Sequence, residues 1–333
     1  MPEQRGYRLR RTFILALFVV CAVLLASCDS GSPGANATPT GKFSEFRLPD
    51  ASGPETITAG PDGNLWFTEK LSNKIGSITP QGTIKEYPLP TANGFPEGIV
   101  AGPDGNLWFT EQAGAIGSIT PQGTIKEYPI QNPDVRPSEI VKGADGNLWF
   151  ADSATGNIGR ITPQGKIDLM DLQGPPSIAA GIVAGKDGTL WFTDSGTGGV
   201  GHFMADGSVK LYPLSTGTRI PAGIAAGPDG NLWFTENAGN SIGRITPQGT
   251  ITEFSSGLTA KCGLMGITSG PGGLWFTEFV GNKIGRVTPQ GTITEFGVPT
   301  ANSAPKSIVA GPNGTLWFTE SSSNQIGRFT PDK

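Results

Sequence analysis

Residues 60–69 read Gly-Pro-Asp-Gly-Asn-Leu-Trp-Phe-Thr-Glu, and the same ten residues return unchanged at 102–111 and 227–236. The tripeptide Leu-Trp-Phe within this stretch occurs seven times, 41 or 42 residues apart, and accounts for every tryptophan: Trp66, Trp108, Trp149, Trp191, Trp233, Trp275 and Trp317. A fixed period of about 40 residues indicates a repeat architecture, because one such unit cannot bury its apolar face without stacking on a copy of itself. The chain therefore carries one array of seven repeats.

Each repeat holds four short runs rich in Ile, Val, Phe, Thr and Tyr, separated by turn residues. Pro-Asp-Gly-Asn, as at 61–64, supplies the Asp-Gly of a tight hairpin. Thr-Pro-Gln-Gly, as at 79–82, suits a type I turn. No helical periodicity follows the N-terminal region. Each repeat is thus predicted to be a four-stranded antiparallel meander, which at this length and with this aromatic signature is typical of a β-propeller blade.

The two ends of the array predict how the ring closes. The last copy stops after its third run, at 325–330, and lacks a fourth. Residues 43–49, Phe-Ser-Glu-Phe-Arg-Leu-Pro, match the fourth run Ile-Lys-Glu-Tyr-Pro-Leu-Pro at 84–90. We expect 43–49 to be the outer strand of blade seven, which removes two open sheet edges. The predicted fold is an all-β, seven-bladed propeller in one domain, residues 42–333.

Composition narrows the possible functions. The chain has 24 Lys and Arg against 28 Asp and Glu, a net charge of -4, and the acidic excess grows once its four N-terminal arginines are set aside. A protein that tracks a nucleic-acid backbone needs a basic stripe, so this class is excluded. The 50 glycines suit many short strands joined by turns. We expect a monomer.

The N-terminus has a different character. Four arginines precede an apolar run at 13–26, and Leu-Ala-Ser-Cys follows at 25–28. This pattern predicts a lipoprotein-type signal peptide, residues 1–27, with Cys28 as the lipidated residue and 28–41 as a flexible linker. The expected location is the extracytoplasmic side of the cell membrane, with a lipid anchor. An ordinary signal peptide or membrane anchor with a chance cysteine is the alternative, and Sec and twin-arginine export both stay open.

A carboxylate follows Trp-Phe-Thr, or its variant, in every repeat. Features shared by all copies of a repeat usually serve stacking, so we interpret these residues as acceptors of a repeated hydrogen bond from neighbouring loop amides. An acidic rim for a cation is the alternative. The seven residues are Glu69, Glu111, Asp152, Asp194, Glu236, Glu278 and Glu320.

One position varies between copies, just before each inner strand, in the loop expected to feed the central channel. It holds Glu55, Glu97, Ser138, Ala180, Ala222, Met265 and Lys306. From these and the adjacent Glu139 we predict a ligand-contacting set at the axial face: Glu55, Glu97, Ser138, Glu139, Met265 and Lys306. Solvated loop residues without a ligand are the alternative. Arg136 and Arg219 lie in the same loops and are candidates to meet an anionic ligand.

Two residues that often carry chemistry are weak candidates here. His202, the only histidine, occupies a third-strand position that is serine or arginine in the other repeats. Cys262 has Lys261 beside it but no histidine to act as a base. We predict no catalytic role for either residue.

The repeat, with Asn-x-Ile-Gly-Arg-Ile-Thr and Gly-x-Ile-x-Glu-Tyr-Pro-Leu-Pro after the opening stretch, resembles the virginiamycin B lyase, or streptogramin lyase, family over essentially all of 43–333. The resemblance implies a seven-bladed propeller that opens cyclic type B streptogramins by magnesium-dependent β-elimination, without water. It also implies a site built from a Pro-His-x-Ile loop in blade six and a Glu-Pro-His-x-Ile loop in blade seven, whose histidine is the base.

This chain departs from that pattern. Met265 and Lys306 stand where the family has histidines, Ala304 stands where it has the metal-binding glutamate, and Glu320 matches a further acidic residue on the next strand. Loss of a general base and of a metal that stabilises negative charge should leave little elimination activity. We expect Lys306 to be held charged in an ion pair with Glu55.

Three functions stay open. We predict first a membrane-tethered propeller, without a cofactor, that binds a small molecule or cell-envelope partner at its axial face and performs no catalysis. The second is a divergent Mg²⁺-dependent carbon–oxygen lyase, or another propeller enzyme, using Glu55, Glu97 and Lys306; its candidate catalytic residues are Lys306 and Glu320. The third is an architectural protein with no small ligand.

Overall fold

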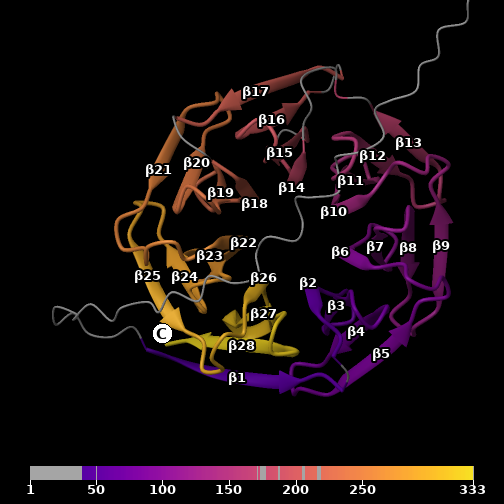
Figure 1. Cartoon of the computed structure of the whole chain (residues 1–333), viewed down its shortest axis with the longest axis horizontal. Coiled ribbons are helices and arrows are strands. Elements are labelled where there is room, and N and C mark those ends of the chain that lie inside the picture. The colour runs from indigo at the N-terminus through magenta and orange to yellow at the C-terminus, as the bar shows by residue number, and fades with distance from the viewer. Residues whose placement is uncertain are drawn as a thin grey trace, which may run out of the picture. The chain divides into compact units, whose positions relative to one another are not determined.

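The computed structural model describes residues 40–49, 51–170, 172, 178–186, 188–204, 207–215 and 219–332. Residues 39–333 form one compact unit. Its strands make seven four-stranded antiparallel sheets arranged as blades around a central axis (Figure 1), which confirms the predicted all-β propeller. The one helical element within the described residues is a 3-10 turn, Pro312–Gly314. None of the described helical structure is long and apolar enough to cross a membrane.

Each blade runs in chain order from its inner to its outer strand. Blade one comprises β2 (Pro54–Ala59), β3 (Leu65–Glu69), β4 (Lys74–Ile78) and β5 (Ile84–Pro88); blade two β6 (Pro96–Ala101), β7 (Leu107–Glu111), β8 (Ala115–Ile119) and β9 (Ile125–Pro129); blade three β10 (Pro137–Lys142), β11 (Leu148–Asp152), β12 (Ile158–Ile161) and β13 (Ile167–Met170). Blade four comprises β14 (Ala179–Ala184), β15 (Leu190–Asp194), β16 (Gly199–Phe203) and β17 (Val209–Pro213); blade five β18 (Pro221–Ala226), β19 (Leu232–Glu236), β20 (Ser241–Ile245) and β21 (Ile251–Phe254); blade six β22 (Leu264–Gly270), β23 (Gly273–Glu278), β24 (Lys283–Val287) and β25 (Ile293–Gly297).

Blade seven joins the two ends of the chain. Its sheet order is β1 (Gly41–Arg47), β28 (Gln325–Pro331), β27 (Leu316–Glu320) and β26 (Pro305–Ala310). The predicted ring closure is therefore confirmed. The closing strand begins and ends two residues earlier than the expected 43–49, because Gly41 already pairs with Pro331, whereas Leu48 has left the ladder and its N–H donates to the Asn324 carbonyl at 3.0 Å.

The repeated aromatics form the interfaces between blades. Trp66 of blade one is fully buried and shares a cluster with Ile99 and Leu107 of blade two. Its indole N–H donates to Asp62 of the Asp-Gly hairpin at 3.1 Å. Gly76 is needed on the next strand, because an added Cβ would lie 2.1 Å from the Phe67 ring. The Asp-Gly-Asn-Leu-Trp-Phe signature thus encodes both the turn and the interface behind it.

Nearer the axis, a threonine links neighbouring blades. The Thr235 hydroxyl donates to the Met265 carbonyl of blade six at 2.5 Å and accepts the Gly223 N–H of its own inner strand at 2.9 Å. The equivalent threonines of five other blades do the same, namely Thr68, Thr110, Thr193, Thr277 and Thr319. Blade three has Ala151 at this position, so its junction with blade four lacks this threonine bridge.

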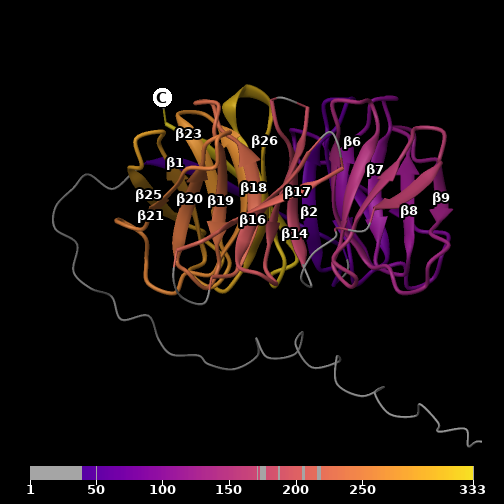
Figure 2. The same cartoon turned by 90° about the horizontal axis from the view of Figure 1, so that it is seen from above.

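Two kinds of loop meet on one face of the ring. Glu69 at the end of the second strand pairs with both Pro54 and Lys74, so the loop at 70–73 and the entry to the inner strand lie together. We call this side, in every blade, the entry face; the Asp-Gly hairpins lie on the opposite face. The strands run between the two faces (Figure 2).

Candidate functional site

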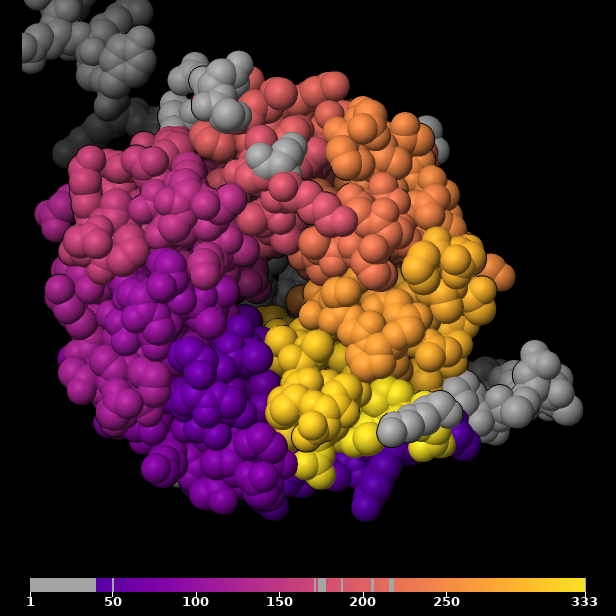
Figure 3. Space-filling model, turned by 180° about the vertical axis from the view of Figure 1, so that it is seen from behind, coloured from indigo at the N-terminus to yellow at the C-terminus, as the bar shows by residue number. Residues whose placement is uncertain are grey.

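The predicted channel residues occupy one equivalent position around the axis. Glu55, Glu97 and Lys306 are each the second residue of an inner strand, and Ser138, Ala180, Ala222 and Met265 complete the ring. They were expected in the preceding loops; the structure places them inside the strands, because pairing of Pro54 with Glu69 starts the sheet one residue earlier. The ring is hollowed at its centre (Figure 3).

Blades seven, one, two and three contribute a charged arc. Lys306 Nζ forms an ion pair with Glu55 Oε2 across the closing seam. Glu97 accepts a hydrogen bond from Gln112 and lies 3.5 Å from Lys70. Glu139 is partly buried, and its carboxylate lies in the electrostatic field of Lys306, Glu97 and Glu55 without a hydrogen bond to any of them.

Electrostatics ties these four side chains together. Burial raises the pKa of Glu139 to about 7; Glu97 and Glu55 add to the effect, and Lys306 opposes it. Desolvation disfavours the charged form of Lys306, but Glu55 and Glu97 outweigh it and raise the pKa of the ammonium. The structure therefore brings Glu55, Glu97, Glu139 and Lys306 into one interacting group.

Blades four, five and six contribute an apolar arc, Ala180, Ala222 and Met265. The residue after each is a glycine, and an added Cβ on Gly181 would lie 2.6 Å from the Ala222 carbonyl. The inner strands therefore approach closely along this arc. Met265 is held by an Asn237 side-chain N–H, 3.3 Å from its sulfur. The channel mouth thus has one charged and one apolar side.

Three further candidates are engaged within the protein. Ser138 is buried, and its hydroxyl donates to the Ala151 carbonyl at 3.3 Å. Arg219 forms ion pairs with Glu236 at 2.8 Å and Glu253 at 3.0 Å. Arg136 donates to carbonyls of its own loop, at 2.7 and 2.8 Å. Arg219 is therefore neutralised by two glutamates, whereas Arg136 keeps its charge and has its guanidinium held by carbonyls.

The seven repeated carboxylates are all fully buried, so they form no acidic rim. Asp152 and Asp194 accept loop amides, for example from Arg136 N at 2.9 Å, as expected. The glutamates do not follow that expectation: Glu69 accepts a serine hydroxyl, while Glu111 and Glu278 have no hydrogen-bond partner for either oxygen among the described residues. A glutamate side chain is one methylene longer than an aspartate side chain. The carboxylates of Glu111 and Glu278 instead face a glutamate on the outer strand, which repels their negative charge.

These glutamate pairs recur in five blades and have raised pKa values. Burial, reinforced by Glu127, raises the pKa of Glu111 to about 8. Burial and Glu295 raise the pKa of Glu278 to about 8. Burial and the outer-strand glutamate of the same blade also raise the pKa of three other residues to about 7: Glu69, Glu236 and Glu320. Each pair therefore favours a proton on its inner member.

The positions that correspond to the lyase site do not fit a magnesium ion. Ala304 is buried and offers no side-chain donor. Glu320 accepts a hydrogen bond from Ser323 at 3.0 Å, and burial raises its pKa to about 7. Lys306 brings a positive charge to these positions, which disfavours binding of a metal cation there. No group of three or more His, Cys, Asp or Glu side chains suited to a metal occurs in the described part of the chain.

The side chains of His202 and Cys262 are both held by contacts within the fold. The His202 ring stacks on Trp191 with centroids 3.9 Å apart, and its Nε2 lies 2.7 Å from the Thr189 hydroxyl. Cys262 is buried and free, its sulfur 3.2 Å from Asn240 Oδ1. Burial and the nearby Glu278 raise the pKa of its thiol, which disfavours the reactive thiolate.

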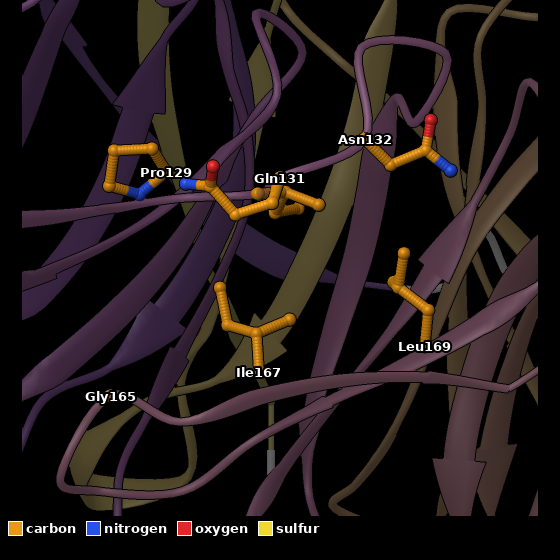
Figure 4. A pocket seen from close by; sticks show the side chains of 7 residues that line it. Pro129, Gln131, Asn132, Gly165, Ile167 and Leu169 are labelled. Atoms are coloured by element: carbon orange, nitrogen blue, oxygen red, sulfur yellow. The ribbon is translucent and has the colours of Figure 1, made fainter.

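A separate groove of about 430 Å³ lies on the outer wall between blades two and three (Figure 4). Ile167 and Leu169 of β13 face Gln131 and Asn132, which follow β9. None of the predicted site residues lines it, and it contains no ionisable side chain. It therefore adds nothing to the chemistry of the channel mouth.

Comparison with known proteins points to one family. The sequence model of the virginiamycin B lyase family matches residues 35–176 and 112–333. Virginiamycin B lyase of Nocardia farcinica is 33% identical over 74 residues, 22% of this chain and 26% of that protein. The enzyme of Bordetella bronchiseptica is 45% identical over 40 residues, 12% and 13% of the two chains. These matches span only a minor part of the curated relatives.

Solved structures extend the similarity to the whole ring. A streptogramin B lyase structure superposes with a TM-score of 0.83 and 38% identity, covering 88% of this chain and 98% of the other. A catalytically inactive variant of virginiamycin B lyase from Staphylococcus aureus, solved with quinupristin, gives the same score and identity and covers 88% and 100%.

Proposed function

The chain belongs to the virginiamycin B lyase family, and from that premise we propose that it is a binding protein that has kept the family scaffold and lost the lyase site. Its ligand, a small molecule or a cell-envelope partner, would be bound at the axial mouth on the entry face. The fold sets only a prior for this function, because one scaffold can host unrelated activities. The proposal rests instead on the residues at the mouth.

The Lys306–Glu55 ion pair is the observation that carries the proposal. A general base needs a free lone pair near the operating pH. The Lys306 ammonium has none while it is protonated, and Glu55 and Glu97 favour its protonated form. The chain therefore presents a fixed positive charge where the resemblance requires a proton acceptor.

The ligands that a magnesium ion would need also support loss of the lyase site. A bound Mg²⁺ would supply stabilisation of negative charge that develops on the substrate oxygen. Ala304, Met265 and Lys306 provide no oxygen ligand, so the donor set for that ion is missing. We derive no catalytic step through magnesium in this chain.

The competing function is a divergent carbon–oxygen lyase, favoured by 38% identity over nearly the whole length of solved lyases. To decide, the purified protein is incubated with a type B streptogramin and Mg²⁺, and the products are separated by chromatography and mass spectrometry. We expect intact antibiotic. A linear product of unchanged mass, abolished by Lys306→Ala or Glu320→Gln, would show that elimination persists on a different base.

We further propose that a lipid on Cys28 anchors the propeller on the outer side of the cell membrane. The Leu-Ala-Ser-Cys pattern at 25–28 supports this. Cys28, the signal segment and the linker lie outside the described residues apart from 40–41.

A further inference from the structure

We propose that the axial mouth takes an organic monocation with an apolar body, its ammonium or guanidinium group on Glu139 and its apolar part against the blade-four to blade-six side. This inference deepens the proposed binding function and rests on it.

Three carboxylates share the charge of Lys306 at the mouth, and Glu139 is the one that no cation contacts directly within the described residues. Lys306 neutralises Glu55, and Lys70 lies 3.5 Å from Glu97. Glu139 has no cation in contact within the described residues, although it is partly buried. A carboxylate held away from water without a partner is costly, and a bound cation would relieve that cost. One such group matches one positive charge on the ligand.

Glu139 is the only long, charged side chain at its position in the seven inner strands. Blades two, four, five and six have Gly98, Gly181, Gly223 and Gly266 there, blades one and seven have Thr56 and Ser307, and an added Cβ on Gly98 would lie 2.5 Å from the Ser138 carbonyl. Blade three tolerates a long side chain at the junction with blade four, where Ala151 replaces the bridging threonine. Packing between the inner strands therefore does not explain why a glutamate is present at this position. Electrostatics does not explain it either, because the carboxylate is placed near two other carboxylates.

The order of the blades gives the ligand its second requirement. Blade three is followed around the ring by blades four, five and six. Glu139 thus stands at the boundary between the charged arc and the apolar arc of Ala180, Ala222 and Met265. A ligand whose cation reaches Glu139 has an apolar wall next to it, which suits a hydrocarbon or aromatic body rather than a bare metal ion.

The entry face carries further apolar side chains. Large exposed hydrophobic side chains gather in its loops: Leu71 is 72% exposed and Val280 60%, with Phe95, Ile178 and Ile220 just above 40%. Five of the eight large exposed hydrophobics among the described residues lie on this one face. They come from five different blades and lie on the same face as the charged arc, where each offers an apolar contact to the body of a ligand.

Phe95 is the aromatic one of these exposed side chains and is tied to the charged arc. Its carbonyl accepts the Gln112 N–H at 3.2 Å, and the Gln112 side chain in turn holds Glu97. Aromatic rings attract organic cations, so Phe95 is the exposed residue of this face best suited to the body of such a ligand. The exposed side chains and the arc therefore favour the same ligand chemistry, since the two lysines of the arc are already paired with Glu55 and Glu97.

The test compares three ligands of one shape: 2-phenylethylammonium, the neutral 2-phenylethanol and the anionic 3-phenylpropionate. Binding to the purified full-length protein is measured by calorimetry at about pH 8, where Glu139 is largely ionised. We expect only the ammonium to bind. Glu139→Gln should weaken it about tenfold or more, because a charge-assisted contact is lost. Asp134→Asn, which removes one negative charge from an exposed loop residue, should leave the affinity unchanged.

A pH series provides a second measurement. Affinity should fall as pH is lowered through about 7, because protonation of Glu139 removes the partner charge while Glu55, Glu97 and Lys306 still face it. In Glu139→Gln this pH dependence should disappear. Equal binding of the ammonium and the alcohol, no binding of the ammonium, or unchanged affinity in Glu139→Gln would overturn the inference. Each of these results is separate from the streptogramin assay, which tests whether lyase activity is absent.

Discussion

Lys306 of blade seven and Glu55 of blade one form an ion pair across the seam where the ring closes, although 251 residues separate them in the chain. The second residue of β26 thus meets the second residue of β2. The contact links closure of the propeller to the charge of the channel mouth, because the same lysine also offsets Glu97 and Glu139.

Removing the lysine should therefore cost stability. Lys306→Met leaves Glu55 partly buried without its cation, and we expect the free energy of unfolding in urea to fall by about 1–3 kcal/mol. The double variant Lys306→Met with Glu55→Gln should recover most of the loss. If the single and double variants unfold alike, the pair makes no net contribution across the seam.

The closing strand should be required for a monomeric fold. Deleting residues 40–49 exposes the edge of β28, and an unpaired edge of a sheet recruits other chains. We expect oligomers or aggregates by size-exclusion chromatography with light scattering. A chain without residues 29–39 is the matched control and should stay monomeric. A monomeric β1 deletion that melts with the parent would show that three strands suffice for blade seven.

Stability should decrease as pH rises from about 5 to 8. The folded-state pKa of Glu111 is raised from 4.5 to about 8, so the folded protein binds more protons than the unfolded chain between these values. For each such group, the free energy of unfolding falls by up to about 1.4 kcal/mol for every unit by which the pH rises within that window. Glu69, Glu236, Glu278 and Glu320 act in the same direction.

Thermal melts of Glu111→Gln check this sign. The variant should be more stable than the parent near pH 8, where the parent buries a charge without a partner, and the difference should vanish near pH 5. Asp134→Asn serves as the control for a simple change in net charge. A variant that is equally destabilised at both pH values would mean that Glu111 makes a favourable contact when ionised.

The lipid anchor has its own test. In cells that express the full chain, Cys28→Ala should move the propeller from the membrane fraction to the soluble extracytoplasmic fraction and abolish labelling by a fatty-acid analogue. Cys262→Ala should change neither, because that thiol is buried in blade six. Retention of Cys28→Ala in the membrane, without label, would identify the apolar run at 13–26 as the anchor.

The sequence alone determined the fold to a high level of detail. Seven tryptophans at one spacing specify seven blades, because each must be buried against the next repeat. The match between 43–49 and the fourth run of other repeats specified the closing strand to within two residues. The sequence also predicted that the variable residues would occupy one equivalent place in every repeat, and the structure has them all as the second residue of an inner strand.

Only the tertiary structure decided which side chains meet one another. That Glu111 and Glu278 lack hydrogen-bond partners, and that glutamates pair within five blades, depends on how far each side chain reaches inside its blade. That Lys306 meets Glu55 while Glu139 is left unpaired depends on the curvature of the whole ring, which sets distances between residues far apart in sequence. Repetition in the sequence encodes local packing, whereas charge neutralisation around the axis is a property of the closed circle.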